Sequence, residues 1–133
     1  MSESSYPYTA KDGDCAYVSN TDVSVADFVK VVDNSVDDLV NAIALGPVSV
    51  TIEADKRCFQ IYKSGVFNNV NCGTTLDHAV TAVGYGTDPV GGDYYTVRNS
   101  WGSSWGEAGY IRIARVAGAG ICGIQTGSLY PIV

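Results

Sequence analysis

The clearest periodic pattern in the chain lies between residues 34 and 47. Four apolar residues there fall at i, i+3, i+4 and i+7, the spacing of one helix face: Val36, Leu39, Val40 and Ile43. Asn34 or Ser35 supplies an N-cap, and two aspartates occupy the first turn, where the helix dipole favours negative charge. Gly46-Pro47 ends the pattern, so we predict one helix near residues 35–45.

Alternation of apolar and polar residues predicts strands elsewhere. Directly after the helix, the segment PVSVTIEA alternates apolar with polar side chains and groups Glu53 with the polar set. Further strands are predicted at residues 78–86 (HAVTAVGYG), 93–100 (DYYTVRNS) and 109–116 (GYIRIARV), and another within 23–31 (VSVADFVKV). A turn-rich TDPVGG and a glycine-rich loop with both tryptophans connect them. We therefore expect an α+β fold, a mostly antiparallel β-domain with one clear helix.

Composition and charge narrow the classes of function. A chain of 133 residues, 46% hydrophobic and 17% charged, has the composition of one globular domain. The net charge is −6 without a lysine and arginine cluster, which argues against nucleic acid or anionic lipid as a partner. The uncharged run at residues 39–52 is too short and too broken by Gly46-Pro47 to span a membrane. The start, MSESSYPYTA, has neither the basic nor the apolar region of a signal peptide.

The four cysteines form no C-x-x-C pair, and the chain has a single histidine to join them. A zinc site is therefore not expected, and no motif implies a cofactor. An even number of cysteines in a small, glycine-rich chain favours disulfides and an oxidising compartment. The alternative is a set of scattered buried thiols, which behave as small apolar side chains.

The single histidine, His78, begins a predicted strand. A lone histidine in an apolar stretch is more often structural than catalytic, because catalysis needs a group that orients the ring. Asn99 ends another predicted strand 21 residues later, and a hairpin would bring the two together. Its side-chain oxygen would fix one ring tautomer and leave the other nitrogen free to act. Trp101, two residues on, would cover that hydrogen bond.

Two long motifs now add a resemblance to a known family. LDHAVTAVGYG, followed by YYTVRNSWGSSWGEAGYIRIAR, resembles the C-terminal half of papain-like cysteine peptidases of the cathepsin L type. Shorter segments agree: SYPYTAKDGDCAY, LGPVSVTIEA, FQIYKSGVF and CGIQTGSLYPIV. The resemblance covers nearly the whole chain. It implies the mainly antiparallel, β-barrel-like C-terminal half of the papain fold over residues 1–133.

The resemblance also implies roles for individual residues. His78 would pair with a catalytic thiolate and later protonate the leaving amine, Asn99 would orient it, and Trp101 would shield the pair. Trp105 would pack beside Trp101 as a structural residue. Peptide bonds would be the substrate, and no cofactor would be needed.

The substrate-binding positions that the resemblance implies are Thr51, Leu76, Asp77 and Gly127. Of these, Thr51, Leu76 and Gly127 would form the specificity pocket. None of the three is charged, which implies substrates with an apolar or aromatic side chain.

The remaining expectations from the resemblance concern cysteines and compartment. Cys72 and Cys122 match a family disulfide. Cys15 matches a cysteine whose partner lies upstream, and the state of Cys58 is left open. The acidic composition and the expected disulfides suit a lysosomal, vacuolar or secreted enzyme.

One large departure from the family concerns the nucleophile. The Cys-Gly-Ser-Cys-Trp type of motif and the oxyanion-hole glutamine belong to a helical N-terminal half, and the motif would fall before residue 1. Three hypotheses follow: one chain of a two-chain peptidase, a fragment of an ordinary peptidase, or a half retained without catalysis as a binding or structural subunit. The first two require an N-terminal half on another chain or on a missing upstream segment. We expect the isolated chain to be inactive.

Overall fold

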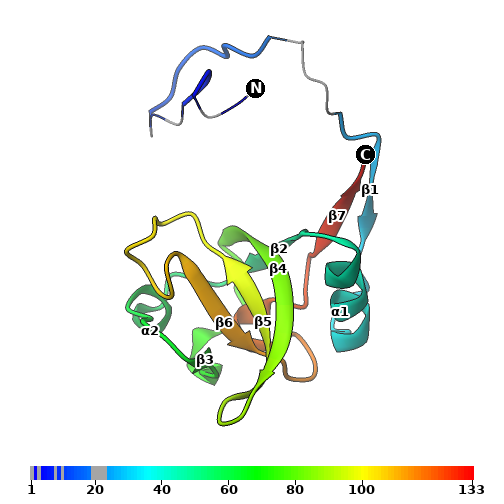
Figure 1. The fold of residues 1–133 in the computed structure, drawn as a ribbon, viewed down its shortest axis with the longest axis vertical. Coiled ribbons are helices and arrows are strands. Elements are labelled where there is room, and N and C mark those ends of the chain that lie inside the picture. Colours follow the sequence, from blue (N-terminus) through cyan, green and yellow to red (C-terminus); the bar gives the residue numbers. More distant parts are fainter. Residues whose placement is uncertain (1, 3, 8, 10, 19–23) are drawn as a thin grey trace.

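A computed structural model describes the chain except residues 1, 3, 8, 10 and 19–23. Figure 1 shows a bent sheet with one longer helix beside it, and an N-terminal segment that leads away from both. The two helices are α1 (Val36–Leu45) and α2 (Arg57–Gln60), and short 3-10 turns occur at η1 (Val70–Cys72) and η2 (Ile121–Gly123). The strands are β1 (Asp27–Lys30), β2 (Val48–Ile52), β3 (Val66–Phe67), β4 (His78–Asp88), β5 (Gly92–Arg98), β6 (Tyr110–Ala114) and β7 (Leu129–Ile132).

These strands form one seven-stranded sheet in the order β1-β7-β2-β4-β5-β6-β3. Every pairing is antiparallel except that of β3 with β6. β4 and β5 form a hairpin with a register shift between Ala82 and Gly84, and β4 curves strongly over the sheet in Figure 1. A bulge of this kind bends a strand and increases its twist. The predicted α+β fold with a mostly antiparallel sheet is confirmed.

Helix α1 matches its prediction closely. Of the two candidate caps, Ser35 is the one used: its Oγ accepts from the backbone N–H of Asp38 at 3.2 Å. Asn34 instead takes a positive φ of 63° and leads the chain into the cap. Leu39 and Ile43 are buried, as their helical spacing predicts. The helix ends at Leu45 because Gly46, in an extended conformation, leaves the helical path before Pro47.

The core lies on one face of the sheet and beneath α1. Alternate residues of β2 are buried, and the same holds for the centres of β5 and β6. The largest side chains that are completely buried are Tyr95, Phe59, Leu39, Ile52, Ile111, Ile113 and Ile124. The alternation of β2 predicts a polar-face position for Glu53, and this is wrong: only 3% of Glu53 is exposed. β2 ends at Ile52, so the period of two no longer applies one residue later.

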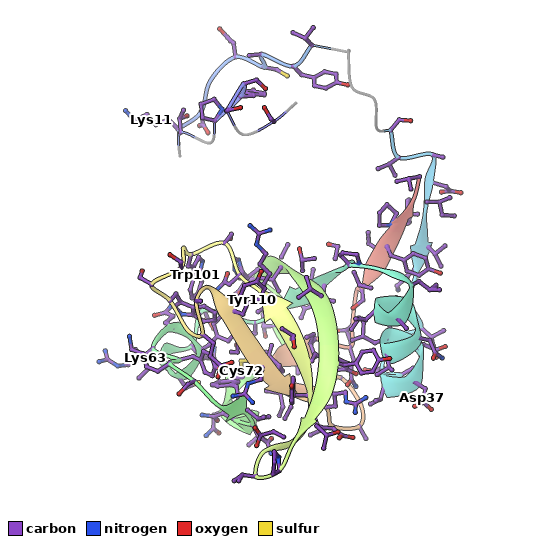
Figure 2. All side chains as sticks on the ribbon, in the orientation of Figure 1. Lys11, Asp37, Lys63, Cys72, Trp101 and Tyr110 are labelled. Atoms are coloured by element: carbon purple, nitrogen blue, oxygen red, sulfur yellow. A yellow bond between two sulfur atoms is a disulfide. The ribbon has the colours of Figure 1, made fainter. Side chains whose placement is uncertain are left out.

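Several short elements have no clear signal in the sequence. β3, α2 and the two 3-10 turns contain two to four residues each, and β7 includes Pro131. The strand predicted within residues 23–31 exists as β1, and residue 23 lies outside the described part of the chain. The disulfide implied by the resemblance is present, since Cys72, labelled in Figure 2, is joined to Cys122 and so links η1 to η2. Cys15 is a free, exposed thiol, and Cys58 is a free, half-buried one.

Two further findings apply to the described residues only. No helix among them has the length and apolar character needed to cross a membrane. Nor do they contain a group of three or more His, Cys, Asp or Glu side chains arranged to hold a metal ion.

Candidate active site

His78 and Asn99 meet at one end of the β4–β5 hairpin. His78 is the first residue of β4 and lies opposite Ile52 of β2, and Asn99 follows the last residue of β5. Nε2 of His78 lies 2.9 Å from Oδ1 of Asn99. The hydrogen bond expected from the sequence is therefore present, and the antiparallel hairpin produces it.

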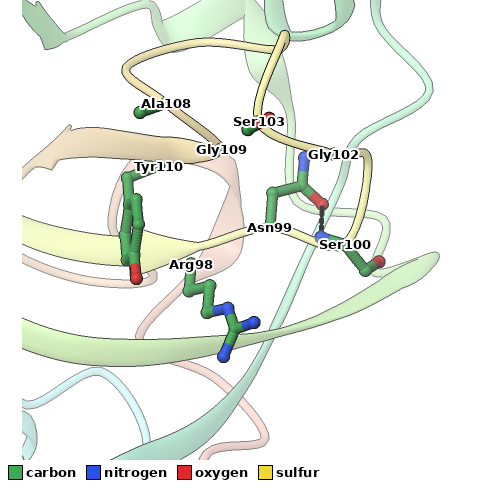
Figure 3. A pocket seen from close by; sticks show the side chains of 8 residues that line it. All are labelled: Arg98, Asn99, Ser100, Gly102, Ser103, Ala108, Gly109 and Tyr110. Carbon is green, nitrogen blue, oxygen red and sulfur yellow. Dashed lines mark hydrogen bonds between the residues drawn. The ribbon is translucent and has the colours of Figure 1, made fainter. Parts of the chain in front are cut away.

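The partners of Asn99 determine which way its amide points. Oδ1 also accepts the backbone N–H of Ser100 at 2.7 Å, so this atom is the oxygen (Figure 3). An oxygen only accepts, so Nε2 of His78 carries the proton and donates it. Nδ1 of a neutral ring is then left as a proton acceptor. Asn99 is 7% exposed, which limits competition from water for its oxygen.

Trp101 covers the histidine. Its indole stacks on the His78 ring at a centroid distance of 5.2 Å and an interplanar angle of 28°. The same indole meets the ring of Phe59 edge-on, at a centroid distance of 5.6 Å. Trp101 remains 39% exposed, so it covers one face of the His78 ring while forming part of the surface. The position expected from the sequence agrees with the structure.

Trp105 anchors the loop that carries Trp101. Its indole Nε1–H donates to the carbonyl of Gln60, at the end of α2, at 2.9 Å. Its ring packs against Phe59 at 5.3 Å and Tyr62 at 5.6 Å, and meets Trp101 edge-on at 5.3 Å. The two indoles thus differ in role. One lies over the histidine, and the other fastens the loop to α2.

A charged cluster holds the far end of the same loop. The guanidinium of Arg112 donates to both carboxylate oxygens of Glu107, at 2.9 and 2.7 Å, and to Asp88 at 2.8 Å. Glu107 Oε1 also accepts the backbone N–H of Gly65 at 2.9 Å. The Arg112 bonds, with help from Gly65, hold the pKa of Glu107 below its ordinary value although partial burial opposes this. No sequence pattern indicates this cluster, because its residues come from four separate segments.

Residues 99–109, between β5 and β6, form the loop that carries both tryptophans, which we call the tryptophan loop. A pocket of about 390 Å³ opens beside Asn99, under this loop (Figure 3). Arg98, Ser100, Ser103 and Tyr110 contribute polar groups to its lining. In Figure 3 the amide nitrogen of Asn99 points toward the loop at Gly102. That nitrogen is buried and has no hydrogen-bond partner among the described residues. The same amide therefore uses its oxygen for His78 and directs its nitrogen at the loop.

The three residues assigned to a specificity pocket lie together. A Cβ placed on Gly127 would be 2.8 Å from Oγ1 of Thr51 and 3.8 Å from Cδ1 of Leu76. Thr51 Oγ1 donates to the carbonyl of Thr126 at 2.9 Å, and this bond fixes the orientation of the Thr51 side chain. Asp77 is held differently, because its Oδ1 accepts the backbone N–H of Ala54 at 2.8 Å. Asp77, which directly precedes His78, is thus hydrogen-bonded to the backbone at Ala54.

Comparisons with known proteins agree with this architecture. The sequence profile of the family described as Papain family cysteine protease matches residues 1–132. Cysteine protease 1 of Oryza sativa subsp. japonica is 53% identical, over 98% of this chain and 27% of its own length. Cathepsin L-like of Caenorhabditis elegans is 46% identical, over 98% of this chain and 40% of its own length. The chain therefore spans well under half of these relatives.

A solved structure gives the same result at the level of the fold. The bromelain protease from Ananas comosus, in complex with the E64 inhibitor, superposes with a TM-score of 0.91 at 46% identity. The match covers 99% of this chain and 62% of that one. The α+β fold, with its dominant sheet, is that of the β-rich C-terminal half of a papain-like protease. The chain belongs to the papain family of cysteine proteases, as the motifs around His78 and Asn99 predicted.

Proposed function

We propose that this chain supplies the histidine and asparagine of a papain-like cysteine endopeptidase, and that the nucleophilic thiol lies on polypeptide outside these 133 residues. One observation carries the proposal. His78 is held in a single tautomer by Asn99, 2.9 Å away, under a stacked indole, so its Nδ1 is oriented as a base. Membership of the papain family gives that base its class of partner, a cysteine thiol.

The chemistry follows from the free nitrogen of His78. Nδ1 takes the thiol proton, and the thiolate attacks the substrate carbonyl carbon to form a tetrahedral intermediate. When the C–N bond breaks, the imidazolium returns the proton to the leaving amine and an acyl-enzyme remains. His78 then deprotonates a water molecule, which attacks the thioester and releases the acid and the thiol. Asn99 keeps the ring in place through each of these proton transfers, because its oxygen accepts from Nε2–H in the neutral and the charged state.

Specificity is assigned to the group formed by Thr51, Leu76 and Gly127. These residues are uncharged and adjacent, and Leu76 offers an apolar side chain that is 39% exposed. A substrate residue placed against them would bury apolar surface, so an apolar or aromatic side chain is favoured over a charged one.

A second polypeptide segment is supported by the surface as well as by the chemistry. Phe28 and Val32, in and just after β1, are 62% and 61% exposed, and Ile132 of β7 is 43% exposed. Phe28 lies opposite Pro131 and Ile132 lies opposite Asp27, so large apolar side chains are exposed on both faces of the β1–β7 pair. Exposed apolar surface of this kind favours an interface with another segment. The disulfide and the acidic composition favour an oxidising, acidic compartment, lysosomal, vacuolar or extracellular.

Reconstitution tests the proposal. The chain is refolded with the N-terminal half of a relative, for example Cysteine protease 1 of Oryza sativa subsp. japonica. A fluorogenic peptide with an apolar residue in second place before the cleaved bond is supplied under reducing, mildly acidic conditions. We expect turnover by the reconstituted pair alone. Neither half by itself should cleave. This chain would offer base assistance without the nucleophile, which supplies only about 10²–10⁴-fold, far below what amide hydrolysis needs. The N-terminal half would have the thiol without its base.

The control is His78→Gln in the same reconstituted pair, which should fold and lose turnover. Turnover by the 133-residue chain alone, abolished by Cys58→Ser, would contradict the proposal. A well-folded pair that binds peptide without cleaving it would favour the alternative, a non-catalytic binding or structural half.

A further inference from the structure

Glu53 is a buried carboxylate that the catalytic chemistry does not use. It follows the last residue of β2, is 3% exposed, and lies 2.6 Å from the ammonium of Lys56. Its second oxygen, Oε2, accepts the backbone N–H of Thr75 at 2.5 Å. Burying a charge is costly unless it is paired and hydrogen-bonded, and both conditions are met here. Lys56 and Thr75 accordingly hold the pKa of Glu53 below its ordinary value.

The contacts of Glu53 form half of a reciprocal arrangement between two segments. The Glu53 carboxylate reaches across to Thr75, and the Asp77 carboxylate reaches back to the N–H of Ala54 at 2.8 Å. Between them, the N–H of Asp77 donates to the carbonyl of Ile52 at 3.0 Å. We call these three bonds the clasp. It joins residues 52–54 to residues 75–77, immediately before His78.

The chain next to the clasp is shaped around the Glu53 carboxylate. Gly73 has a φ of 82°, and a Cβ placed on it would lie 2.7 Å from Cδ and 2.8 Å from Oε1 of Glu53. Any other residue would collide with the carboxylate in addition to adopting a strained backbone. Glycine at this position therefore lets the loop come close enough for Thr75 to reach Oε2.

Leu76 follows Thr75 directly and depends on this backbone for its position. A Cβ on Gly123 would lie 2.8 Å from Cδ2 of Leu76, and one on Gly127 would lie 3.8 Å from Cδ1. The Leu76 side chain therefore rests over two glycines beside Thr51. It is 39% exposed, so packing around it is incomplete. The bond from the Thr75 N–H to Glu53 fixes the backbone directly before it.

We propose that Glu53 is a positioning residue for the specificity pocket: by holding the Thr75 N–H, it keeps Leu76 against Gly123 and Gly127 as the wall that receives an apolar substrate residue. This inference rests on the proposed function, which assigns Thr51, Leu76 and Gly127 to that pocket. Glu53 itself touches no substrate. It acts through one backbone bond, and the charge on Lys56 keeps it ionised for that bond.

Affinities test this inference separately from cleavage. Two reduced-amide peptides, which cannot be cleaved, differ only in having Leu or Gly at the position that enters the pocket. Their dissociation constants are measured on the reconstituted pair by calorimetry. Unaltered protein should prefer the Leu peptide. Glu53→Ala should reduce that preference about tenfold, which corresponds to about 1.4 kcal/mol and to losing part of an apolar contact.

A second variant and a matched control accompany the first. Glu53→Gln keeps the size of the side chain but turns an NH2 group toward either Lys56 or Thr75, so it should give a smaller loss of preference in a protein that folds more readily. Asp55→Ala removes the other carboxylate that contacts Lys56, at 3.0 Å, and leaves the Thr75 bond intact. This control should keep the preference of the unaltered protein.

Kinetics with cleavable versions of the same peptides distinguish positioning from a general structural role. KM for the Leu peptide should rise in the Glu53 variants while kcat stays within about twofold, because Asn99 still orients His78. The Gly peptide should show little change in either constant. A fall in kcat for both peptides with an unchanged ratio would overturn the inference.

The two proposals fail in distinguishable ways. A pair that prefers the Leu peptide but never cleaves contradicts the proposed function and still allows the Glu53 variants to be compared by affinity. Folded Glu53 variants with the preference of the unaltered protein overturn this inference alone. Unaltered protein without any preference overturns it too, since no apolar wall would then exist for Glu53 to position.

Discussion

Asn99 shows how much one side chain contributes at the scale of the residue. Its oxygen accepts two N–H groups, from His78 at 2.9 Å and from Ser100 at 2.7 Å, and the second bond keeps the oxygen turned toward the ring. Asn99→Ala removes the orienting bond. We expect kcat of the reconstituted pair to fall about a hundredfold, the lower range of positioned acid–base catalysis, with KM changed little.

Ser100→Ala is the matched control for that prediction. It deletes the neighbouring exposed hydroxyl and leaves the backbone N–H that Asn99 accepts, so kcat should stay within about twofold. Steady-state kinetics with one fluorogenic peptide compare the two variants. An Asn99→Ala variant as active as Ser100→Ala would show that His78 needs no orienting partner.

Residue identities alone revealed the His78–Asn99–Trp101 group, because the strand pattern implied a hairpin and the motifs around it resemble a family. Glu53 was misplaced for a physical reason. Its burial depends on Lys56 and on the backbone at Thr75, and neither contact leaves a periodic signal. Buried charged groups are satisfied by partners distant in sequence, which a local pattern does not reveal.

At the scale of the element, periodicity predicted the long elements and, among the short ones, only β1. Helix α1 and strands β2, β4, β5 and β6 each have five or more residues, enough for the period of a helix or strand to be visible. β3 has two residues and α2 has four, so neither completes a recognisable pattern. Yet α2 carries Phe59 and the Gln60 carbonyl, on which the tryptophan loop packs. The support for the tryptophan loop thus comes from elements that local sequence rules do not identify.

The tryptophan loop leads to a prediction about acid stability. Glu107 fastens this loop to Arg112 and to the Gly65 N–H, and its pKa is lowered by both contacts. A lowered pKa in the folded state means that the stabilisation is present above the ordinary carboxyl pKa and is lost as pH falls through the lowered value. Glu107→Gln should therefore reduce the free energy of unfolding near neutral pH by about 1 kcal/mol, a modest value because the pair is partly exposed.

The difference between Glu107→Gln and the unaltered protein should shrink toward zero in acid, where the carboxyl is protonated in both states. Thermal unfolding from pH 7 down to pH 2 measures this. Asp93→Asn serves as the comparison, since it removes a carboxylate that pairs with Arg115. The Asp93 side chain is 52% exposed, so this substitution should reduce the free energy of unfolding by less. A constant difference at every pH would show that charge is not the source of the stabilisation.

At the scale of the whole molecule, the Cys72–Cys122 disulfide connects the core to the region that we propose binds substrate. It closes a separation of 50 residues, and Gly73 and Gly123, which adjoin its two cysteines, contact Glu53 and Leu76 respectively.

Converting both cysteines to serine should lower the free energy of unfolding by about 4 kcal/mol, because the unfolded chain regains the freedom that the crosslink removes. Denaturant unfolding of the reconstituted pair measures the loss, and Cys58→Ser, which removes a free half-buried thiol, should cost far less. The selectivity for an apolar substrate residue should weaken in the double-serine variant as well, since the loop held by Glu53 loses its second attachment. Peptide mapping of unreduced protein that finds Cys72 and Cys122 as free thiols would contradict the pairing, and an unchanged unfolding midpoint would contradict its contribution to stability.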